Sequence, residues 1–204
     1  MILCYHNLIR DAEVDENLYR RSYEGAPLLY YRKESMFKND MARIIENIML
    51  DDYLTKNGVA ITFDDGRLNN YEIAFPIMKK FGLKGSFFVS TSKVGQPDYM
   101  TWNQLREMAD FGNTIESHGH LHKPFDEMTD EQVLEDITKS ADLIEKGVGR
   151  RPHFLSLPGG RYVKKDLVKQ AGYIGIRTSE KGINDDIWNL WVVMMLNNSV
   201  LEVV

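Results

Sequence analysis

Residues 59–66 read Val59-Ala60-Ile61-Thr62-Phe63-Asp64-Asp65-Gly66, an apolar run that ends in two aspartates and a glycine. The apolar run predicts a short buried strand. Successive strand side chains point to opposite faces, so adjacent carboxylates can serve one site only where the strand ends and the backbone turns. Gly66 supplies the freedom for that turn. Paired carboxylates repel each other unless a cation or a shared proton compensates. The stretch therefore indicates a metal site with a spare carboxylate, although a solvated turn fits this motif alone equally well.

A histidine cluster is the second informative feature. Residues Ser117–His122 read Ser-His-Gly-His-Leu-His and hold three of the five histidines of the chain. On a helical turn, His118 and His122 would share one face, with roughly 5–6 Å between their Cβ atoms, and His120 would face elsewhere. Two neutral imidazoles and one carboxylate are typical of a catalytic zinc or non-haem iron site with open positions. The alternative is a histidine-rich surface loop, which the position of the cluster directly after an apparent strand, Thr114–Glu116, disfavours.

A third motif, Phe154–Tyr162, reads Phe-Leu-Ser-Leu-Pro-Gly-Gly-Arg-Tyr. With these three motifs in this order, the chain resembles the polysaccharide deacetylase family, the NodB-homology group also called carbohydrate esterase family 4. The resemblance extends from Ile2 to about Met194. The first two motifs are specific in combination, and the third is looser.

The resemblance implies a role for each matching residue. In that family the first aspartate of the pair is the general base, and the second aspartate binds a divalent metal, usually zinc, together with the two histidines. The implied base is Asp64. The implied ligands of Zn²⁺ or another divalent metal are Asp65, His118 and His122. The third motif supplies the implied oxyanion and substrate contacts. We expect the main-chain N–H of Gly159 to donate to the oxyanion, and we assign Arg161 and Tyr162 to the same oxyanion and substrate group.

The chain departs from the family pattern at the general acid. The family usually supplies this proton donor from a histidine near the C-terminus, but no histidine follows His153 here. His6 closes the first predicted strand, and the first and last strands of a closed barrel are neighbours. A branch of the family, resembling the exopolysaccharide poly-N-acetylglucosamine deacetylases, carries such an N-terminal Tyr-His. We therefore predict that His6 is the general acid; the alternative is a strand-end histidine that caps a buried carbonyl.

A second departure concerns the base. Many family members carry an arginine in the third motif that orients the catalytic aspartate. Ser156 stands at the matching position, so we expect that this arginine is absent. Whether Arg161 reaches the site instead is left open by its position five residues further along.

Short apolar runs alternate with amphipathic segments, which predicts parallel strands joined by crossover helices. The predicted strands are Ile2–His6, Val59–Phe63, Gly85–Val89, Asn113–Glu116, Phe154–Leu157, Ile174–Arg177 and Leu190–Met194. This order predicts an α/β fold, a distorted and incomplete (β/α) barrel of about seven parallel strands, which is also the fold of the resembled family. Because catalytic groups of such barrels lie at the C-terminal ends of strands, all three motifs are expected at one rim.

The helices are predicted from apolar stripes and capping signals. One stripe runs from Phe37 to Ile48 and another from Tyr71 to Phe81, with Gly82 suited to the end of the second helix. Capping boxes begin further helices at Thr101 and Thr129. The segment Asn7–Lys33 is longer than an ordinary connection. It is either a solvated insertion or a lid or substrate wall rich in tyrosine.

Composition bounds the function. The chain has 204 residues, one cysteine and a formal charge of −5, so we expect a single domain over residues 1–204 and no nucleic-acid partner. No segment approaches the ~20 apolar residues of a membrane span. Met1 leads directly into a strand-like segment without a signal-peptide pattern, which predicts a cytoplasmic protein as given, with an exported form as the alternative.

We interpret the chain as a metal-dependent hydrolase that removes N-acetyl groups from a glycan containing amino sugars. An O-deacetylase that acts on an acetylated polysaccharide is an alternative, since the same groups would serve it. A non-catalytic glycan-binding module is a second alternative, disfavoured because binding alone does not require a base beside a metal. A metal-dependent amidohydrolase of small amides on a related barrel is a third.

Overall fold

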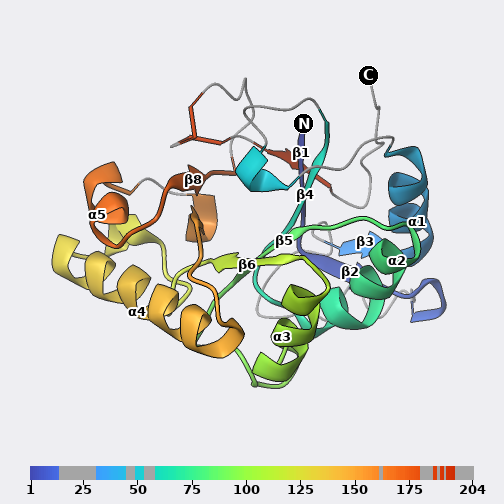
Figure 1. Ribbon diagram of the computed structural model, residues 1–204, viewed down its shortest axis with the longest axis horizontal. Helices are drawn as coiled ribbons and strands as arrows, with labels where there is room; N and C mark the ends of the chain where they lie inside the picture. Colours follow the sequence, from blue (N-terminus) through green and yellow to red (C-terminus); the bar gives the residue numbers. More distant parts are fainter. Residues whose placement is uncertain are drawn as a thin grey trace.

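A curled parallel sheet of seven strands, in the order β8-β7-β6-β5-β4-β1-β9, forms the centre of the protein (Figure 1). The computed structural model describes residues 1–13, 31–44, 49–52, 58–160, 163–179, 186–187, 189–190 and 192–195. The seven strands are β1 (Ile2–Tyr5), β4 (Ala60–Phe63), β5 (Ser86–Val89), β6 (Thr114–Ser117), β7 (Phe154–Ser156), β8 (Gly175–Arg177) and β9 (Val193–Met194). All pairings between them are parallel, which confirms the predicted distorted, incomplete (β/α) barrel.

The segment that follows β8 lies between the two edges of the sheet. Leu190 forms a parallel bridge with Arg177 of β8. A few residues later, β9 pairs with β1, with Leu3 opposite Val193. The first and last strands are therefore neighbours, as predicted. The closure is irregular, because this segment pairs with its two neighbours at different points, and the barrel is distorted there.

Helices cover the outside of the curled sheet. They are α1 (Glu34–Arg43), α2 (Phe75–Lys80), α3 (Trp102–Asp110), α4 (Asp130–Val148) and α5 (Lys165–Gln170), with the short turns η1 (Asp11–Glu13), η5 (Leu50–Asp52), η6 (Asn70–Ala74), η7 (Phe125–Glu127) and η8 (Pro158–Gly160). In Figure 1, α4 and α5 lie at one end of the molecule and α1 and α2 at the other. Both predicted capping boxes are present, at Thr101 and Thr129. No helix within the described ranges is both long enough and apolar enough to cross a membrane.

Two helices differ from the sequence prediction. Helix α1 ends at Arg43, so the predicted stripe to Ile48 is too long, and its last part, residues 45–48, lies outside the described residues. The segment predicted as one helix from Tyr71 begins with η6, a π-helical turn, before α2. Pro76 explains the change of winding, because proline has no N–H for the bond to residue 72 and crowds the preceding turn. Gly82 adopts φ 69°, as expected of the residue that ends a helix.

A second, two-stranded parallel sheet was not predicted. Its strands, β2 (Asn7–Ile9) and β3 (Tyr31–Lys33), are the two ends of the long insertion; residues 14–30 lie outside the described part. A buried ion pair joins Arg32 to Asp40 of α1, with Nη2–Oδ1 at 2.6 Å and Nε–Oδ2 at 2.9 Å. The hydroxyl of Tyr5 donates to the same carboxylate at 3.1 Å. The insertion therefore begins and ends against the barrel.

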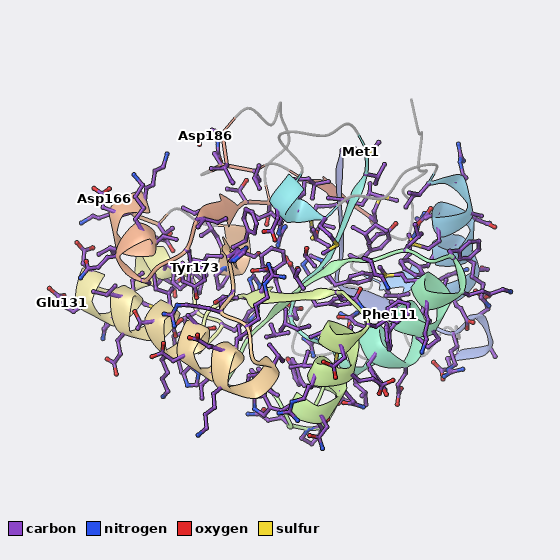
Figure 2. The ribbon with its side chains drawn as sticks, in the orientation of Figure 1. Met1, Phe111, Glu131, Asp166, Tyr173 and Asp186 are labelled. Carbon is purple, nitrogen blue, oxygen red and sulfur yellow. The ribbon has the colours of Figure 1, made fainter. Side chains whose placement is uncertain are left out.

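Aromatic rings fill much of the core. Phe63 and Phe87 from adjacent strands stack with 4.5 Å between ring centroids, and Tyr5 and Phe37 pack beside them. Charged side chains lie outside this core. In Figure 2, for example, Glu131 and Asp166 lie on the outer surface of the helical layer. The strands are buried on both faces, as the apolar runs of the sequence indicate.

The cap of α4 gives a test of the fold. Thr129 accepts a hydrogen bond from the N–H of Gln132, and Gln132 accepts one from the N–H of Thr129. We expect Thr129→Ala to lower the free energy of unfolding by about 1 kcal/mol, measured by urea denaturation, because it leaves a helix donor without its partner. Thr129→Ser keeps the acceptor and should cost less. Equal stability of all three proteins would contradict this role of the cap.

Candidate metal centre and catalytic cleft

The candidate site residues follow different strands but lie at one rim of the sheet. His6 follows β1, Asp64 and Asp65 follow β4, and His118 follows β6. Parallel strands present their C-terminal ends on the same side, so residues far apart in sequence meet there. His6, Asp64, Asp65, His118, His122, Leu157, Gly159, Ser179 and Met194, together with Asn7, line one cleft of about 360 Å³.

Asp65 lies in a strained turn. Its φ is +71°, in the left-handed region, and Gly66 follows with φ +76°. The turn predicted at Gly66 therefore starts one residue earlier, at the aspartate itself. A Cβ at position 66 would lie 3.0 Å from Cγ1 of Val89, so a side chain there would also crowd this valine. Because of this turn, the Asp65 carboxylate points toward the two histidines and away from the direction that a continuing strand would give it. Strain of this kind is typical of functional positions.

The two histidines meet without a helix. The prediction that His118 and His122 lie on a helical turn is wrong, because residues 118–122 form an irregular loop in which Gly119 has φ +71° and His122 has φ +58°. Their rings are nevertheless 4.9 Å apart between centroids. The loop can hold this shape because Asp136 of α4 accepts hydrogen bonds from its backbone, from the N–H of His120 at 2.7 Å and of Leu121 at 2.8 Å.

His120 does not join the other two histidines. Its Nδ1 lies 2.9 Å from Oγ1 of Thr91. His118 is oriented differently, since its Nδ1 lies 3.0 Å from the carbonyl of Ser156. That carbonyl can only accept, so Nδ1 donates and Nε2 is left for the site.

Asp65, His118 and His122 form a compact group of potential ligands. The Oδ1 atom of Asp65 lies 3.5 Å from Nε2 of His118 and 3.2 Å from Nε2 of His122. One carboxylate oxygen and two imidazole nitrogens, all within 4.8 Å of one another, can hold a single divalent ion. The donor set therefore fits the metal that the family resemblance implies.

The electrostatics of this group also suit a cation. Burial would raise the pKa of Asp65, but hydrogen bonds from His118 and His122 more than offset it and hold that pKa well below its usual value. Burial would lower the pKa of His118, but Asp65 and Asp64 raise it above the usual value. The carboxylate thus attracts positive charge to the imidazoles. A metal ion would take the place of that proton.

Asp64 has a different partner. The arginine of the third motif is absent, as expected from Ser156, but an arginine from another strand, which we did not predict for the site, pairs with Asp64. Arg177, the last residue of β8, is fully buried and donates through Nη2 to Oδ2 of Asp64 and to Oγ of Ser156. Ser156 is the β7 residue paired in register with Arg177. The guanidinium therefore arrives from the strand next to the expected one. The sequence contained one indication of this role. Arg177 ends the predicted strand Ile174–Arg177, and residues at the C-terminal ends of the strands are expected at the catalytic rim.

Arg177 also sets the charge of Asp64. Burial would raise the pKa of Asp64, but Arg177, with His118 and His6, lowers it below the usual value, so the carboxylate is ionised at neutral pH. Its other oxygen, Oδ1, accepts no hydrogen bond from any described residue. An ionised carboxylate with an unengaged oxygen can accept a proton.

His6 lies beside Asp64, with 3.8 Å between His6 Nε2 and Asp64 Oδ2. Burial lowers its pKa, and the nearby Asp64 and Asp65 oppose that shift. Gly159 lines the same cleft and has φ +68° within η8. The other two candidates, Arg161 and Tyr162, lie outside the described residues.

A sequence profile of the polysaccharide deacetylase family matches residues 51–179, more than half of the chain. The chain therefore belongs to the polysaccharide deacetylase family. YxkH of Bacillus subtilis, which carries the name of a polysaccharide deacetylase, is 34% identical over 126 residues, covering 61% of this chain and 45% of that protein. The poly-beta-1,6-N-acetyl-D-glucosamine N-deacetylase of Staphylococcus epidermidis is 28% identical over 166 residues, covering 72% of this chain and 57% of that protein. The chain thus spans about half the length of these relatives.

Solved structures share the fold. The Streptococcus pyogenes deacetylase PplD in complex with acetate superposes with a TM-score of 0.85 at 20% identity, over 97% of this chain and 92% of that one. IcaB from Ammonifex degensii gives a TM-score of 0.79 at 20% identity, over 95% and 90%. At these identities the likeness establishes the barrel architecture.

The ligand set predicts how metal binding responds to mutation. We expect His118→Ala to weaken Zn²⁺ binding by more than about 100-fold, because loss of a ligand should exceed the 10–100-fold cost of losing a residue that only orients one. Elemental analysis after dialysis and zinc titration measure this effect. His120→Ala is the matched control and should retain the metal. If His118→Ala binds zinc as well as the unmodified protein, the assignment is wrong and His120 becomes the next candidate ligand.

Proposed function

We propose that this chain is a metal-dependent hydrolase that removes N-acetyl groups from a glycan containing amino sugars. The observation that carries the proposal is the separation of the two adjacent aspartates. Asp65 faces two imidazoles in a ligand set, whereas Asp64 pairs with Arg177 and has a second oxygen that no described residue engages. Binding a glycan does not require a base of this kind beside a metal. The activity named for the Staphylococcus relatives, on poly-β-1,6-N-acetylglucosamine, supports an amino-sugar polymer as substrate.

A divalent ion held by Asp65, His118 and His122, with zinc as the first candidate, would supply Lewis-acid activation of the acetyl carbonyl and of the attacking water. Asp64 then takes the proton of that water through its unengaged oxygen. Arg177 keeps Asp64 ionised and holds its other oxygen in place. Both functions require a fixed, buried guanidinium, which the packing of β8 provides.

The remaining steps use the other side of the cleft. The main-chain N–H of Gly159 donates to the oxygen that becomes negatively charged as water adds to the carbonyl. His6, when protonated, gives its proton to the departing nitrogen of the sugar, and the C–N bond breaks. The products are acetate and a glucosamine unit. His6 lines the cleft near Asp64, as an acid in this reaction requires.

Acetate release from β-1,6-linked N-acetylglucosamine oligomers tests this function directly. The assay is run with the purified chain, after removal of metal with a chelator, and after addition of zinc. We expect release that is lost with the chelator and restored by zinc. O-acetylated xylan serves as the comparison substrate. Faster release from the xylan ester would favour an O-deacetylase, and glycan binding without any release would favour a binding module.

The role of Asp64 predicts a variant that binds metal but does not turn over. Asp64→Asn should retain zinc, because Asp64 is outside the ligand set, and should lower kcat by about 10²–10⁴-fold, the usual cost of losing a general base. Zinc content and acetate release are measured on the same sample. Loss of metal in this variant would mean that Asp64 and Asp65 share or exchange their roles.

His6 gives a prediction for the pH dependence. An acid must be protonated, so turnover should fall as the pH rises through the pKa of His6. His6→Ala should keep zinc, lower kcat, and remove this fall from the alkaline side of the pH–rate profile. His153→Ala, which changes a histidine whose Nδ1 lies 3.0 Å from Asp51, is the control. An unaltered rate and profile in His6→Ala would leave His6 with only a structural role at the end of β1.

A further inference from the structure

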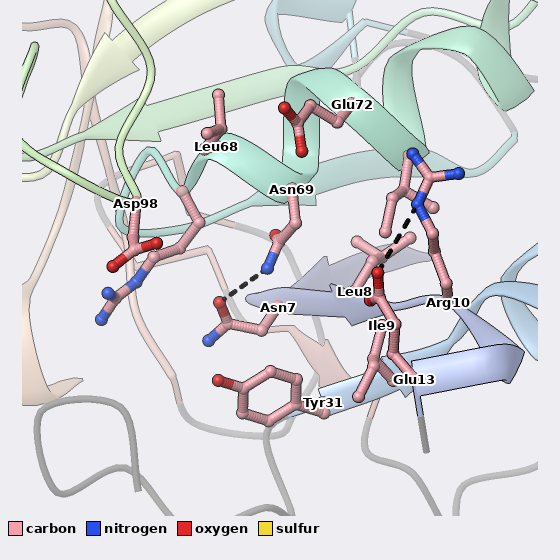
Figure 3. Close-up of a pocket in the computed structure, with 12 residues that line it drawn as sticks. Asn7, Leu8, Ile9, Arg10, Glu13, Tyr31, Leu68, Asn69, Glu72 and Asp98 are labelled. Carbon is pink, nitrogen blue, oxygen red and sulfur yellow. Dashed lines mark hydrogen bonds and ion pairs between the residues drawn. The ribbon is translucent and has the colours of Figure 1, made fainter. Parts of the chain in front are cut away.

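A second cavity adjoins the catalytic cleft. It has a volume of about 350 Å³ and lies between the small β2–β3 sheet and the segment that leads into η6 (Figure 3). Its lining comprises Asn7, Leu8, Ile9, Arg10, Glu13, Tyr31, Arg67, Leu68, Asn69, Glu72, Ile73 and Asp98. Asn7 lines both the cavity and the cleft. Arg67 brings the cavity close to the metal ligands as well, since its Nε lies 3.7 Å from Oδ2 of Asp65.

Asn7 is a nearly buried residue whose side-chain amide nitrogen is not engaged by any described residue. The residue is only 3% exposed, and its Oδ1 accepts a hydrogen bond from Nδ2 of Asn69 at 3.1 Å. Its own amide nitrogen donates to no described residue, so it can donate to a ligand in the cavity. Figure 3 shows the amides of Asn7 and Asn69 pointing toward each other in the cavity, with the ring of Tyr31 nearby.

These amides are held in place from behind. Nδ2 of Asn70 donates to Oδ1 of Asn69 at 3.1 Å and to the carbonyl of His6 at 2.8 Å. Asn70 is fully buried. The amides that line the cavity are therefore fixed relative to the backbone of His6, the proposed general acid. A binding site needs rigid support of this kind.

The walls of the cavity combine apolar side chains with charged groups of both signs, including the guanidinium groups of Arg10 and Arg67. Leu8, Ile9 and Ile73 supply apolar surface. Glu72 and Asp98 line it as exposed carboxylates, and neither forms an ion pair within the described ranges. A pyranose ring has apolar C–H faces and an edge of hydroxyl and amide groups, so apolar walls with amide donors and carboxylate acceptors match its surface.

We propose that this cavity is a subsite for a second amino-sugar unit of the glycan, next to the unit whose acetyl group is removed, and that Asn7 donates to it. The inference rests on the proposed function, because only a polymeric substrate would occupy the cleft and the adjoining cavity together. Substrate binding should therefore strengthen with chain length. A substitution that alters the cavity should reduce this increase of binding with chain length, while the metal ligands and catalytic residues of the cleft stay in place.

The test compares β-1,6-linked N-acetylglucosamine oligomers of one to five units. In the unmodified protein, kcat/KM for acetate release should rise when a second unit is added. Asn69→Ala removes the partner of Asn7, and we expect it to reduce this rise by between about 2- and 10-fold, the worth of one or two hydrogen bonds, mainly through KM. Asn103→Ala, the same change at an exposed position of α3, is the control and should keep the full rise.

Two further measurements separate binding from folding. Glu72→Gln changes an exposed carboxylate of the cavity and should reduce the length dependence in the same direction. In the unmodified protein, the side-chain amide resonances of Asn7 should shift on addition of the trimer more than on addition of the monomer. A length dependence that is the same in both variants as in the unmodified protein would overturn the subsite while the deacetylase function stands. Absence of acetate release from every oligomer would overturn the proposed function and the subsite with it.

Discussion

Parallel pairing of the strands is the constraint on which the site depends. Tyr5 lies opposite Phe63 in the pairing of β1 with β4, so the next residues, His6 and Asp64, leave the sheet side by side. Ser156 lies opposite Arg177 in the same way, and this register places the guanidinium against Asp64. Residues that are more than a hundred positions apart in sequence thus share one rim. None of these contacts would survive a shift of register by one residue, because such a shift reverses the direction of every side chain.

Two neighbouring carboxylates acquire different chemistry from their surroundings. Asp64 ends a regular strand and is balanced by a buried arginine, whereas Asp65 begins a left-handed turn and is balanced by two imidazoles. Burial would raise the pKa of both carboxyl groups, but their different partners, chiefly Arg177 for Asp64 and the two imidazoles for Asp65, lower each pKa below its usual value. The backbone turn at Asp65 allows both carboxylates to face the same cleft while each contacts its own partners. Titratable groups with distinct environments are a common feature of catalytic sites.

The sequence predicted the regular elements well and the irregular ones poorly. Apolar runs and capping boxes mark strands and helices through local rules, so the barrel, its closure and the helix starts at Thr101 and Thr129 were predicted correctly. The loop of His118 and His122 was predicted as helical, because spacing alone does not reveal that Asp136, on a distant helix, shapes its backbone. Arg177 was missed because its partner Asp64 is a non-local contact. The strands β2 and β3 are too short for a periodic signal. The roles of the site residues, and the positions of Arg161 and Tyr162, stay predictions.

The irregular closure of the barrel also has a consequence for how the chain acquires its structure. Leu3 and Val193 are paired, so β1 can complete this pairing only after residue 193 has left the ribosome. Contacts between such distant segments form late, because the entropy of closing a long loop must be overcome first. Met194, which lines the cleft, leaves the ribosome directly after Val193. A nascent chain that has been synthesised only to the end of β8 can therefore assemble most of the sheet and still lack one wall of its cleft.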